Sequence, residues 1–270
     1  KLNFDLTNSQ KKVLKEIRED FSSKKQMNRL LQGDVGSGKT IVAIMSVIIA
    51  VENNFQSCIV APTEILAQQH FSSFINYLSD ININVEILTG STTKLQRKLI
   101  LSDLIIGKID VLIGTHALFE DDVRFKNLGY VVIDEQHKFG VKQRSKMWKK
   151  NNPPPHVLIM TATPIPRTLT MSMYGDLDIS IIDEMPPGRK DIVTVHRKDS
   201  NRLKVFAFLK DQIKSGRQVY IVYPLIEESK KMDLKFLEDG YESLLRDFPR
   251  DKYQVGVLHG KMKNNDKDFE

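Results

Sequence analysis

The sequence predicts an α/β protein built on a parallel sheet, and three observations support this fold class. Short apolar segments alternate with longer segments of helical periodicity along most of the 270 residues. The apolar segments are continuous, which is typical of strands that are buried on both faces of a parallel sheet. A glycine-rich phosphate-binding pattern lies between an apolar lead-in and an apolar helix. Ligands of such sheets bind at the carboxyl ends of the strands, so we expect the site there.

The first element is a helix that Thr7 or Asn8 can cap, with apolar residues Val13, Leu14 and Ile17 at helical spacing. An apolar lead-in from Met27 to the phosphate-binding pattern follows, and then an apolar helix over 41–51. Further strands are predicted at 57–61, 84–88, 110–114, 130–133 and 157–160, with helices at 64–78 and 94–107.

The phosphate-binding pattern G-x-x-x-x-G-K-T occupies residues 33–40. Its glycines let the backbone approach phosphate oxygens, backbone N–H groups point at the anion, and the next helix adds its positive end. Lys39 is expected to reach the β- and γ-phosphates, and the Thr40 hydroxyl to hold magnesium. The alternative is a glycine-rich turn with Lys39 on the surface. The predicted nucleotide-binding residues are Gly33, Asp34, Val35, Gly36, Ser37, Gly38, Lys39 and Thr40.

An acidic pair follows the strand predicted at 130–133. Asp134 is expected to hold magnesium, and Glu135 to polarise the attacking water. The alternative is a solvated acidic turn. His137 is a candidate sensor of the γ-phosphate, although a single histidine is more often a structural hydrogen-bonding residue. No nucleophilic side chain is needed, because phosphoryl transfer depends mainly on positioning and charge stabilisation.

Gln136 and two threonines complete the predicted polar clusters at the strand ends. Thr161 and Thr163 follow the strand predicted at 157–160. Their hydroxyl groups are candidates for coupling the nucleotide to domain motion, and the alternative is a polar strand cap.

Composition sets broad limits. Apolar residues make up 41% of the chain and charged residues 27%, as in an ordinary globular protein. The net charge of +6 suits a polyanion partner, and it suits a solvated basic surface equally well. The single cysteine, Cys58, lies in an apolar run and is interpreted as a core residue of an intracellular protein. The sequence shows no signal peptide and no membrane-spanning run, so we expect a cytoplasmic location.

The segment 185–189 breaks the periodicity and reads as a linker between two domains. The predicted domains are 1–187 and 188–270. The second is expected to be α/β and truncated, because only about three strands precede Glu270. Its predicted strands are 192–195, 219–223 and 254–258, and its predicted helices are 203–214 and part of 230–247.

The motifs stand in the order of motifs I, Ia, a Thr-Gly motif, Ic, II and III of superfamily-two helicases. Their residues are 33–40, 61–64, 89–90, 114–116, 134–137 and 161–163. The longer strings resemble the RecG family of bacterial DNA branch-migration helicases over essentially the whole chain. These strings are 31–40, 134–141, 160–168, 174–178, 222–229 and 258–262. Lys138 departs from the arginine usual in that family.

The resemblance implies two RecA-like lobes that bind ATP and magnesium between them and DNA across their top. It casts Gln10 as the reader of adenine, with Phe4 as a stacking partner. Contacts to the DNA backbone are implied for Pro62, Thr63, Thr89, Gly90, Thr115 and His116. The implied activity is an ATP-dependent helicase or translocase that remodels branched or duplex DNA, at stalled forks and Holliday junctions, in recombination and repair. The resemblance further implies a nucleoid-associated bacterial monomer that contacts single-stranded DNA-binding protein.

The family's wedge domain would precede Lys1, and its motifs V and VI would follow Glu270. We therefore expect this fragment to bind ATP weakly and to hydrolyse it poorly. One alternative is a transcription–repair coupling translocase of the Mfd type, which shares several strings, although Asp-Glu-Gln-His and Tyr-Gly-Asp-Leu-Asp favour RecG. Another is a nucleotide-dependent switch module without helicase activity. A third alternative is a metabolic P-loop kinase, which lacks support because the sequence shows no acceptor pocket.

Overall fold

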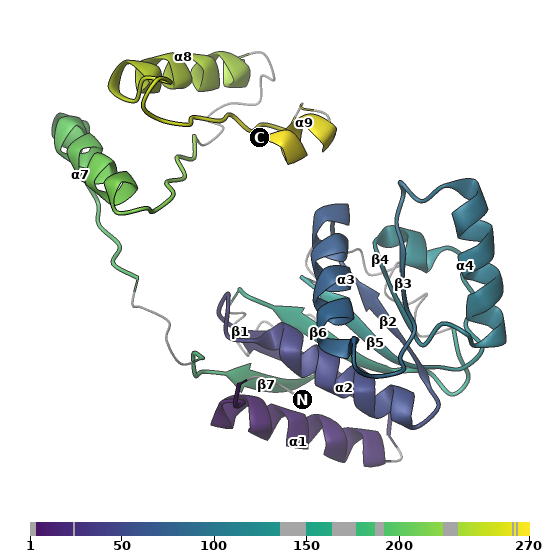
Figure 1. Cartoon of the computed structure of the whole chain (residues 1–270). Coiled ribbons are helices and arrows are strands. Elements are labelled where there is room, and N and C mark those ends of the chain that lie inside the picture. Colours follow the sequence, from purple (N-terminus) through teal and green to yellow (C-terminus); the bar gives the residue numbers. More distant parts are fainter. Residues whose placement is uncertain are drawn as a thin grey trace. The chain divides into compact units, whose positions relative to one another are not determined.

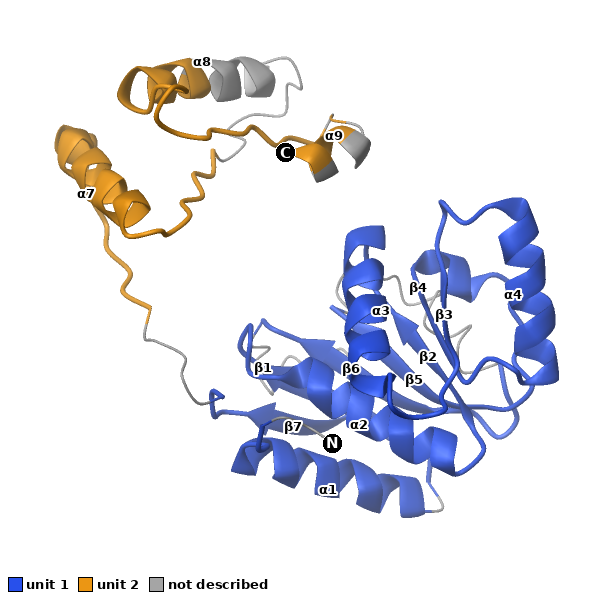
Figure 2. Cartoon of the chain, viewed as in Figure 1, with its two compact units in different colours: residues 1–190 blue, residues 191–270 orange. Residues whose placement is uncertain are grey.

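The computed structural model describes residues 4–23, 25–135, 150–163, 177–186, 192–223, 232–260, 262 and 264–270. The chain divides into two compact units, residues 1–190 and residues 191–270 (Figure 2). Within the described ranges, no helix is both long enough and apolar enough to cross a bilayer.

Unit 1 contains a parallel sheet of seven strands in the order β3-β4-β2-β5-β6-β1-β7 (Figure 1). The strands are β1 (Asn28–Gly33), β2 (Gln56–Val60), β3 (Val85–Leu88), β4 (Val111–Gly114), β5 (Leu128–Asp134), β6 (His156–Thr161) and β7 (Asp178–Ile182). The predicted parallel α/β fold is thus confirmed. Sequence reasoning missed β7, because Asp178 and Ser180 interrupt its apolar residues and it pairs on one side only.

The helices that the structure describes in unit 1 are α1 (Asn8–Ser22), α2 (Lys39–Glu52), α3 (Glu64–Leu78) and α4 (Lys94–Ile106), with a 3₁₀ helix η1 at His116–Phe119. Threonine side chains cap the starts of α1, α3 and α4. Thr7 and Thr93 each form a capping box, and the Thr63 hydroxyl accepts a hydrogen bond from Leu66 N. Gly107 ends α4 with φ of +82°, a left-handed conformation that glycine adopts without strain. The predicted helices at 64–78 and 94–107 are therefore confirmed to within one residue.

Two separate cores lie on the two faces of this sheet. Ile59 of β2 and Val132 of β5 pack with α1, α2 and α3 on one face. Their chain neighbours Cys58 and Val131 pack with α4 and η1 on the other. Successive side chains of a strand point to opposite faces, so a continuous apolar strand fills both cores. Cys58 is fully buried, and burial raises the pKa of its thiol to about 12, in agreement with the predicted core role.

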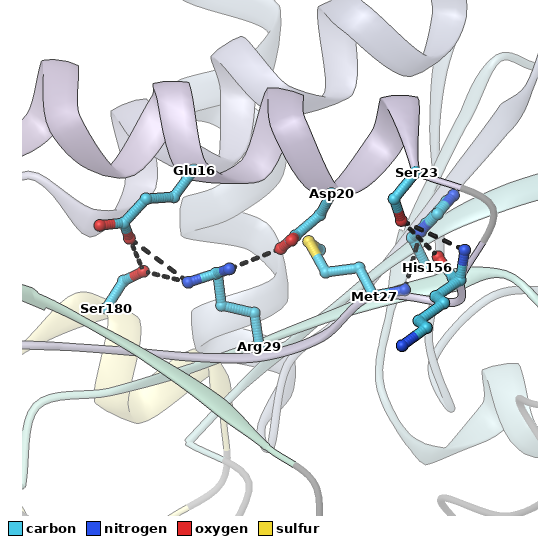
Figure 3. A network of polar contacts seen from close by, with 8 residues as sticks. Glu16, Asp20, Ser23, Met27, Arg29, His156 and Ser180 are labelled. Carbon is cyan, nitrogen blue, oxygen red and sulfur yellow. Dashed lines mark hydrogen bonds and ion pairs between the residues drawn. The ribbon is translucent and has the colours of Figure 1, made fainter.

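A polar network ties α1 to the β7 edge of the sheet (Figure 3). Arg29 of β1 donates from Nε to Asp20 Oδ2 at 2.7 Å and from Nη1 to Glu16 Oε2 at 3.3 Å. Its Nη1 also donates to Ser180 Oγ of β7 at 2.9 Å, and the Ser180 hydroxyl donates to Glu16. The Arg29 side chain is only 10% exposed. We call these four residues the Arg29 network; it joins α1 and β1, which are neighbours in the sequence, to the distant strand β7.

Unit 2 is organised differently. It contains η3 (Asp199–Asn201), α7 (Arg202–Lys214), α8 (Met232–Asp247) and α9 (Asn264–Phe269). Its small core includes Phe206, Leu244 and Phe248. The strands predicted at 192–195, 219–223 and 254–258 are wrong, since these described segments have no regular secondary structure. A β-strand needs a hydrogen-bonded neighbour, and no ladder forms among the described residues of this unit.

Candidate functional site

Three polar segments meet at one edge of the sheet, because they follow three adjacent strands. Gly33 ends β1, Thr161 ends β6 and Asp134 ends β5. In the parallel register, Gln32 lies beside Thr161, and Asp134 lies beside Met160. The strand order therefore brings together residues that are about a hundred positions apart in the chain, at the strand ends where ligands of parallel sheets bind.

The loop between β1 and α2 has the tight backbone expected of a phosphate cradle. Gly36 and Gly38 have φ values of +80° and +87°, which are strained for other residues. A Cβ on Gly38 would lie 2.2 Å from Gln10 Nε2, and a Cβ on Gly33 would lie 2.6 Å from Ser37 Oγ. The Ser37 hydroxyl is buried without a hydrogen-bond partner among the described residues. The glycines thus leave room for a close backbone turn, and α2 begins directly after it at Lys39.

Lys39 follows this turn as the first residue of α2. Its Nζ donates to the carbonyl oxygens of Gly33 at 2.6 Å and Asp34 at 3.0 Å. Burial lowers the pKa of Lys39, while the negative charges of Asp134, Glu135 and Asp34 act in the opposite direction. An ammonium group that is half-buried, held by neutral carbonyls and close to two carboxylates from another strand is well placed to meet an anionic ligand.

Gln10 is buried and holds the cradle from the side of α1. Its Nε2 donates to the Ser37 carbonyl oxygen at 2.8 Å, and its Oε1 accepts from Thr7 N at 3.0 Å. Both ends of the amide are thus engaged with the chain itself. Phe4, the predicted stacking partner for adenine, is 46% exposed and makes an edge contact with Tyr77 at 6.4 Å between ring centroids. The adenine-reading role of both residues stays a prediction.

Glu135 is held in an unusual conformation by the neighbouring strand. Its φ is +49°, a left-handed value that costs a non-glycine residue about 1–3 kcal/mol. Its N–H donates to the Met160 carbonyl oxygen at 2.9 Å. Its carboxylate accepts from Ala162 N at 3.1 Å and from Thr161 Oγ1 at 3.4 Å, and Thr161 Oγ1 lies 2.9 Å from Thr163 Oγ1. The structure therefore brings Thr161 and Thr163 to Glu135; their predicted coupling role stays a prediction.

His70 of α3 is a site residue that the sequence reasoning missed. Its Nε2 lies 2.8 Å from Asp134 Oδ2, and the two side chains are 10% and 13% exposed. A signal was present: His70 lies three residues after Ala67 and four before Phe74, in phase with the buried face of α3. The predicted residues Gln136 and His137 lie outside the described residues, and their roles stay predictions.

The donor set suits magnesium. The Thr40 hydroxyl and the Asp134 carboxylate are hard oxygen ligands of the kind that magnesium prefers. Among the described residues, no group of three or more His, Cys, Asp or Glu side chains is arranged to hold a metal ion. Magnesium is usually held by one or two protein ligands together with waters and substrate phosphates.

The predicted DNA contacts lie along the other half of the same edge. Pro62 and Thr63 follow β2, Thr89 and Gly90 follow β3, and Thr115 and His116 follow β4. These three strands are adjacent in the sheet. Thr63, Gly90 and His116 are exposed, whereas Thr89 and Thr115 are 8% and 2% exposed. Nucleotide-site residues thus lie at the carboxyl ends of β1, β5 and β6, and predicted DNA contacts lie at the carboxyl ends of β2, β3 and β4. The DNA-binding roles stay predictions.

This chain is similar in sequence to known proteins. The family model described as DEAD/DEAH box helicase matches residues 7–172. The chain is similar to the ATP-dependent DNA helicase RecG of Aquifex aeolicus, with 52% identity over 99% of the chain and 34% of the relative. It is also similar to the ATP-dependent DNA helicase RecG of Bacillus subtilis, with 49% identity over 99% of the chain and 39% of the relative. The chain therefore spans between about a third and two fifths of the length of these relatives.

Solved structures give the same result. A structure of RecG bound to a three-way DNA junction matches with a TM-score of 0.81 and 43% identity, over 99% of this chain and 34% of that chain. A structure of Mss116p bound to single-stranded RNA and AMP-PNP matches with a TM-score of 0.67 and 19% identity, over 97% of this chain and 56% of that chain, and this likeness shows the fold alone. The predicted RecA-like helicase fold and the resemblance to RecG helicases are confirmed.

Proposed function

The chain belongs to the DEAD/DEAH box helicase family, and we propose that it is the ATP-hydrolysing motor portion of a DNA helicase or translocase that remodels branched DNA. Its substrates would be stalled forks and Holliday junctions in recombination and repair. The relatives named above are RecG helicases, so the Mfd-type alternative is not favoured.

One observation carries this proposal: Lys39, Asp134 and Glu135 converge at the ends of β1 and β5. The negative charges of both carboxylates raise the pKa of Lys39 against the opposite effect of burial, although β5, which ends at Asp134, begins about ninety residues after Lys39. Phosphoryl transfer depends on this kind of arrangement, in which opposite charges and polar groups are positioned before the substrate arrives.

Each residue has a defined task in this proposal. The backbone N–H groups of 34–39 surround the β- and γ-phosphates, and Lys39 exchanges its carbonyl partners for phosphate oxygens. Glu135 orients the attacking water. A hydrogen bond from its N–H to Met160 and hydrogen bonds from Thr161 and Ala162 to its carboxylate hold Glu135 in place before substrate binds. Little reorganisation is therefore needed during the reaction.

Thr40 and Asp134 would hold magnesium, which when bound would neutralise part of the phosphate charge. At the β3-β4-β2 half of the sheet edge, exposed residues such as Thr63 and His116 would contact the DNA backbone. Such contacts are independent of base sequence and weaken with salt. In this proposal, DNA and ATP bind at the carboxyl ends of different strands of the same sheet. The sheet itself therefore connects the two binding sites.

The test is ATP hydrolysis by the full-length protein with single-stranded, duplex and four-way-junction DNA. We expect the four-way junction to stimulate hydrolysis most. Lys39→Ala should lower the stimulated rate by about 10²-fold or more, because it removes a charge that stabilises the transition state. Lys98→Ala is the matched control, since it removes an exposed lysine of α4 and should leave the rate unchanged.

The other outcomes separate the alternatives. Equal stimulation by duplex and junction DNA would favour a duplex translocase of the Mfd type. DNA remodelling that survives Lys39→Ala would favour a nucleotide-dependent switch module. An ATPase rate that no DNA stimulates would contradict the proposed function.

A further inference from the structure

We propose that His70 is a positioning residue for Asp134, fixing one carboxylate oxygen so that the other remains available to nucleotide-bound magnesium. The inference rests on the proposed function, because it assigns a supporting side chain to the same metal-holding carboxylate. His70 itself contacts neither nucleotide nor metal in this proposal. It acts only through Asp134.

The geometry of the pair supports this role. The imidazole Nε2 is 2.8 Å from Asp134 Oδ2, which is hydrogen-bond distance, and a carboxylate can only accept. Nε2–H therefore donates to Oδ2. A carboxylate has two oxygens and about four acceptor sites, so a bond to Oδ2 leaves Oδ1 free to face a cation.

The surroundings of His70 make the donor rigid. The residue lies on the buried face of α3 with Ala67, Phe74 and Leu78, and its side chain is 10% exposed. Side chains packed in a core occupy defined rotamers. A ring held in this way offers Nε2–H at one fixed point, and the side chain of Asp134, which is 13% exposed, loses rotational freedom before any ligand binds.

This restriction matters because supporting hydrogen bonds orient metal ligands. Removal of such a supporting partner typically costs about 10–100-fold in metal affinity or activity. A purely structural role for His70 predicts something different. A buried imidazole needs a hydrogen-bond partner for its own stability, and its loss would then weaken the fold without singling out the magnesium-dependent part of nucleotide binding.

The test uses a matched pair of variants in the full-length protein, His70→Gln and His70→Met. Glutamine and methionine have nearly the same length and shape, but only glutamine carries an N–H group at the end of the side chain. Affinity for a fluorescent ATP analogue is measured with magnesium and again in the presence of EDTA. Gln69→Ala, at the exposed neighbouring position on α3, is the control.

With magnesium present, we expect His70→Met to bind the ATP analogue about 10–100-fold more weakly than the wild type does. In EDTA, the affinities of the two proteins should differ by less than about twofold. His70→Gln should recover part of the loss, and Gln69→Ala should match the wild type. Equal weakening of His70→Met with and without magnesium, or no weakening in either case, would overturn the positioning role. A wild-type protein that gains no affinity from magnesium would instead overturn the proposed function, and this inference with it.

Discussion

Apolar segments of similar composition are buried in unit 1 but exposed in unit 2. In β2 of unit 1, Cys58 and Val60 are fully buried. In unit 2, Tyr220 and Val222 are 84% and 83% exposed, in a segment for which the sequence predicts a strand just as clearly. Composition therefore does not separate the two segments.

The difference lies in the neighbours. β2 pairs with both β4 and β5, and its two faces meet helices and apolar side chains from distant parts of the chain. No such ladder exists among the described residues of unit 2. Strand propensity measures how well a side chain fits a pleated, half-buried surface, and that surface must come from elsewhere in the fold.

The largest expected contrast is in hydrogen exchange. The amides of β2 are bonded within a two-sided core, and their exchange requires opening of the sheet. We expect them to exchange at least about 10³-fold more slowly than those of 219–222, a difference of about 4 kcal/mol. Hydrogen exchange is measured by mass spectrometry. Equal protection of both segments would contradict this expectation, because a strand would then exist in unit 2.

A matched pair of isoleucines tests the same contrast energetically. Ile59 of β2 is 1% exposed, and Ile192 of unit 2 is 78% exposed. Ile59→Ala should lower the free energy of unfolding by about 3 kcal/mol, because it leaves a cavity in a packed core. Ile192→Ala should change it by less than about 0.5 kcal/mol. Urea unfolding followed by circular dichroism measures both; similar losses would show that Ile192 is packed.

Two arginines extend the comparison to polar contacts. Arg29→Ala removes the cation that pairs with the carboxylates of Glu16 and Asp20, whose side chains are 28% and 22% exposed, and leaves Glu16 with the Ser180 hydroxyl alone. We expect a loss of about 2 kcal/mol in unfolding free energy, below the range for fully buried pairs because water reaches both carboxylates. In unit 2, Arg202 donates to Ser243 Oγ and lies 5.0 Å from the Phe206 ring centre, and Arg202→Ala should cost only about 0.5–1 kcal/mol. An equal cost of the two substitutions, measured by urea unfolding, would contradict this ranking.

The smallest expected effect is a pH dependence within unit 1. His156 Nδ1 accepts a hydrogen bond from Met27 N at 3.0 Å (Figure 3), and burial lowers the pKa of His156 below its ordinary value of 6.5. As the pH falls, the unfolded chain therefore takes up the proton first. The unfolding free energy should be highest above about pH 6.5 and decline from there toward the folded pKa.

His156→Asn is the control for this effect, because the asparagine amide oxygen can take the place of Nδ1 and accept the bond but does not titrate in this range. Urea unfolding at pH 7.5 and 5.5 should give a smaller difference for the variant than for the wild type. The same pH dependence in both proteins would show that other groups cause it.

Much of the fold and half of the candidate site could be predicted from local signals. Thr7 marked the start of the first helix, and apolar runs marked five of the strands of unit 1. Lys39 and Asp134 were identified because each has a fixed place, one after a glycine-rich turn and one at a strand end. Each of these signals is contained within about ten residues of the chain.

The partners of those residues could not be predicted in the same way. His70 meets Asp134 across 64 positions, and Gln10 meets Ser37 across 27. A histidine in phase with an apolar helix face is compatible with many partners, and the sequence does not say which one the fold will supply. The edge strand β7 was missed for the same reason, since Ser180 suits a strand there only because Arg29 and Glu16 satisfy its hydroxyl.

By itself, the sequence determined the fold class, the phosphate-binding turn and the order of the chemical motifs along the chain. Those features depend on local backbone preferences and on hydrophobic periodicity. The tertiary structure alone decided which strands are neighbours, which apolar segments are buried, and which groups from other elements hold Asp134 and Glu135. The physical reason is that pairing, burial and hydrogen bonding between distant residues depend on where the whole chain places them, and no short segment contains that information.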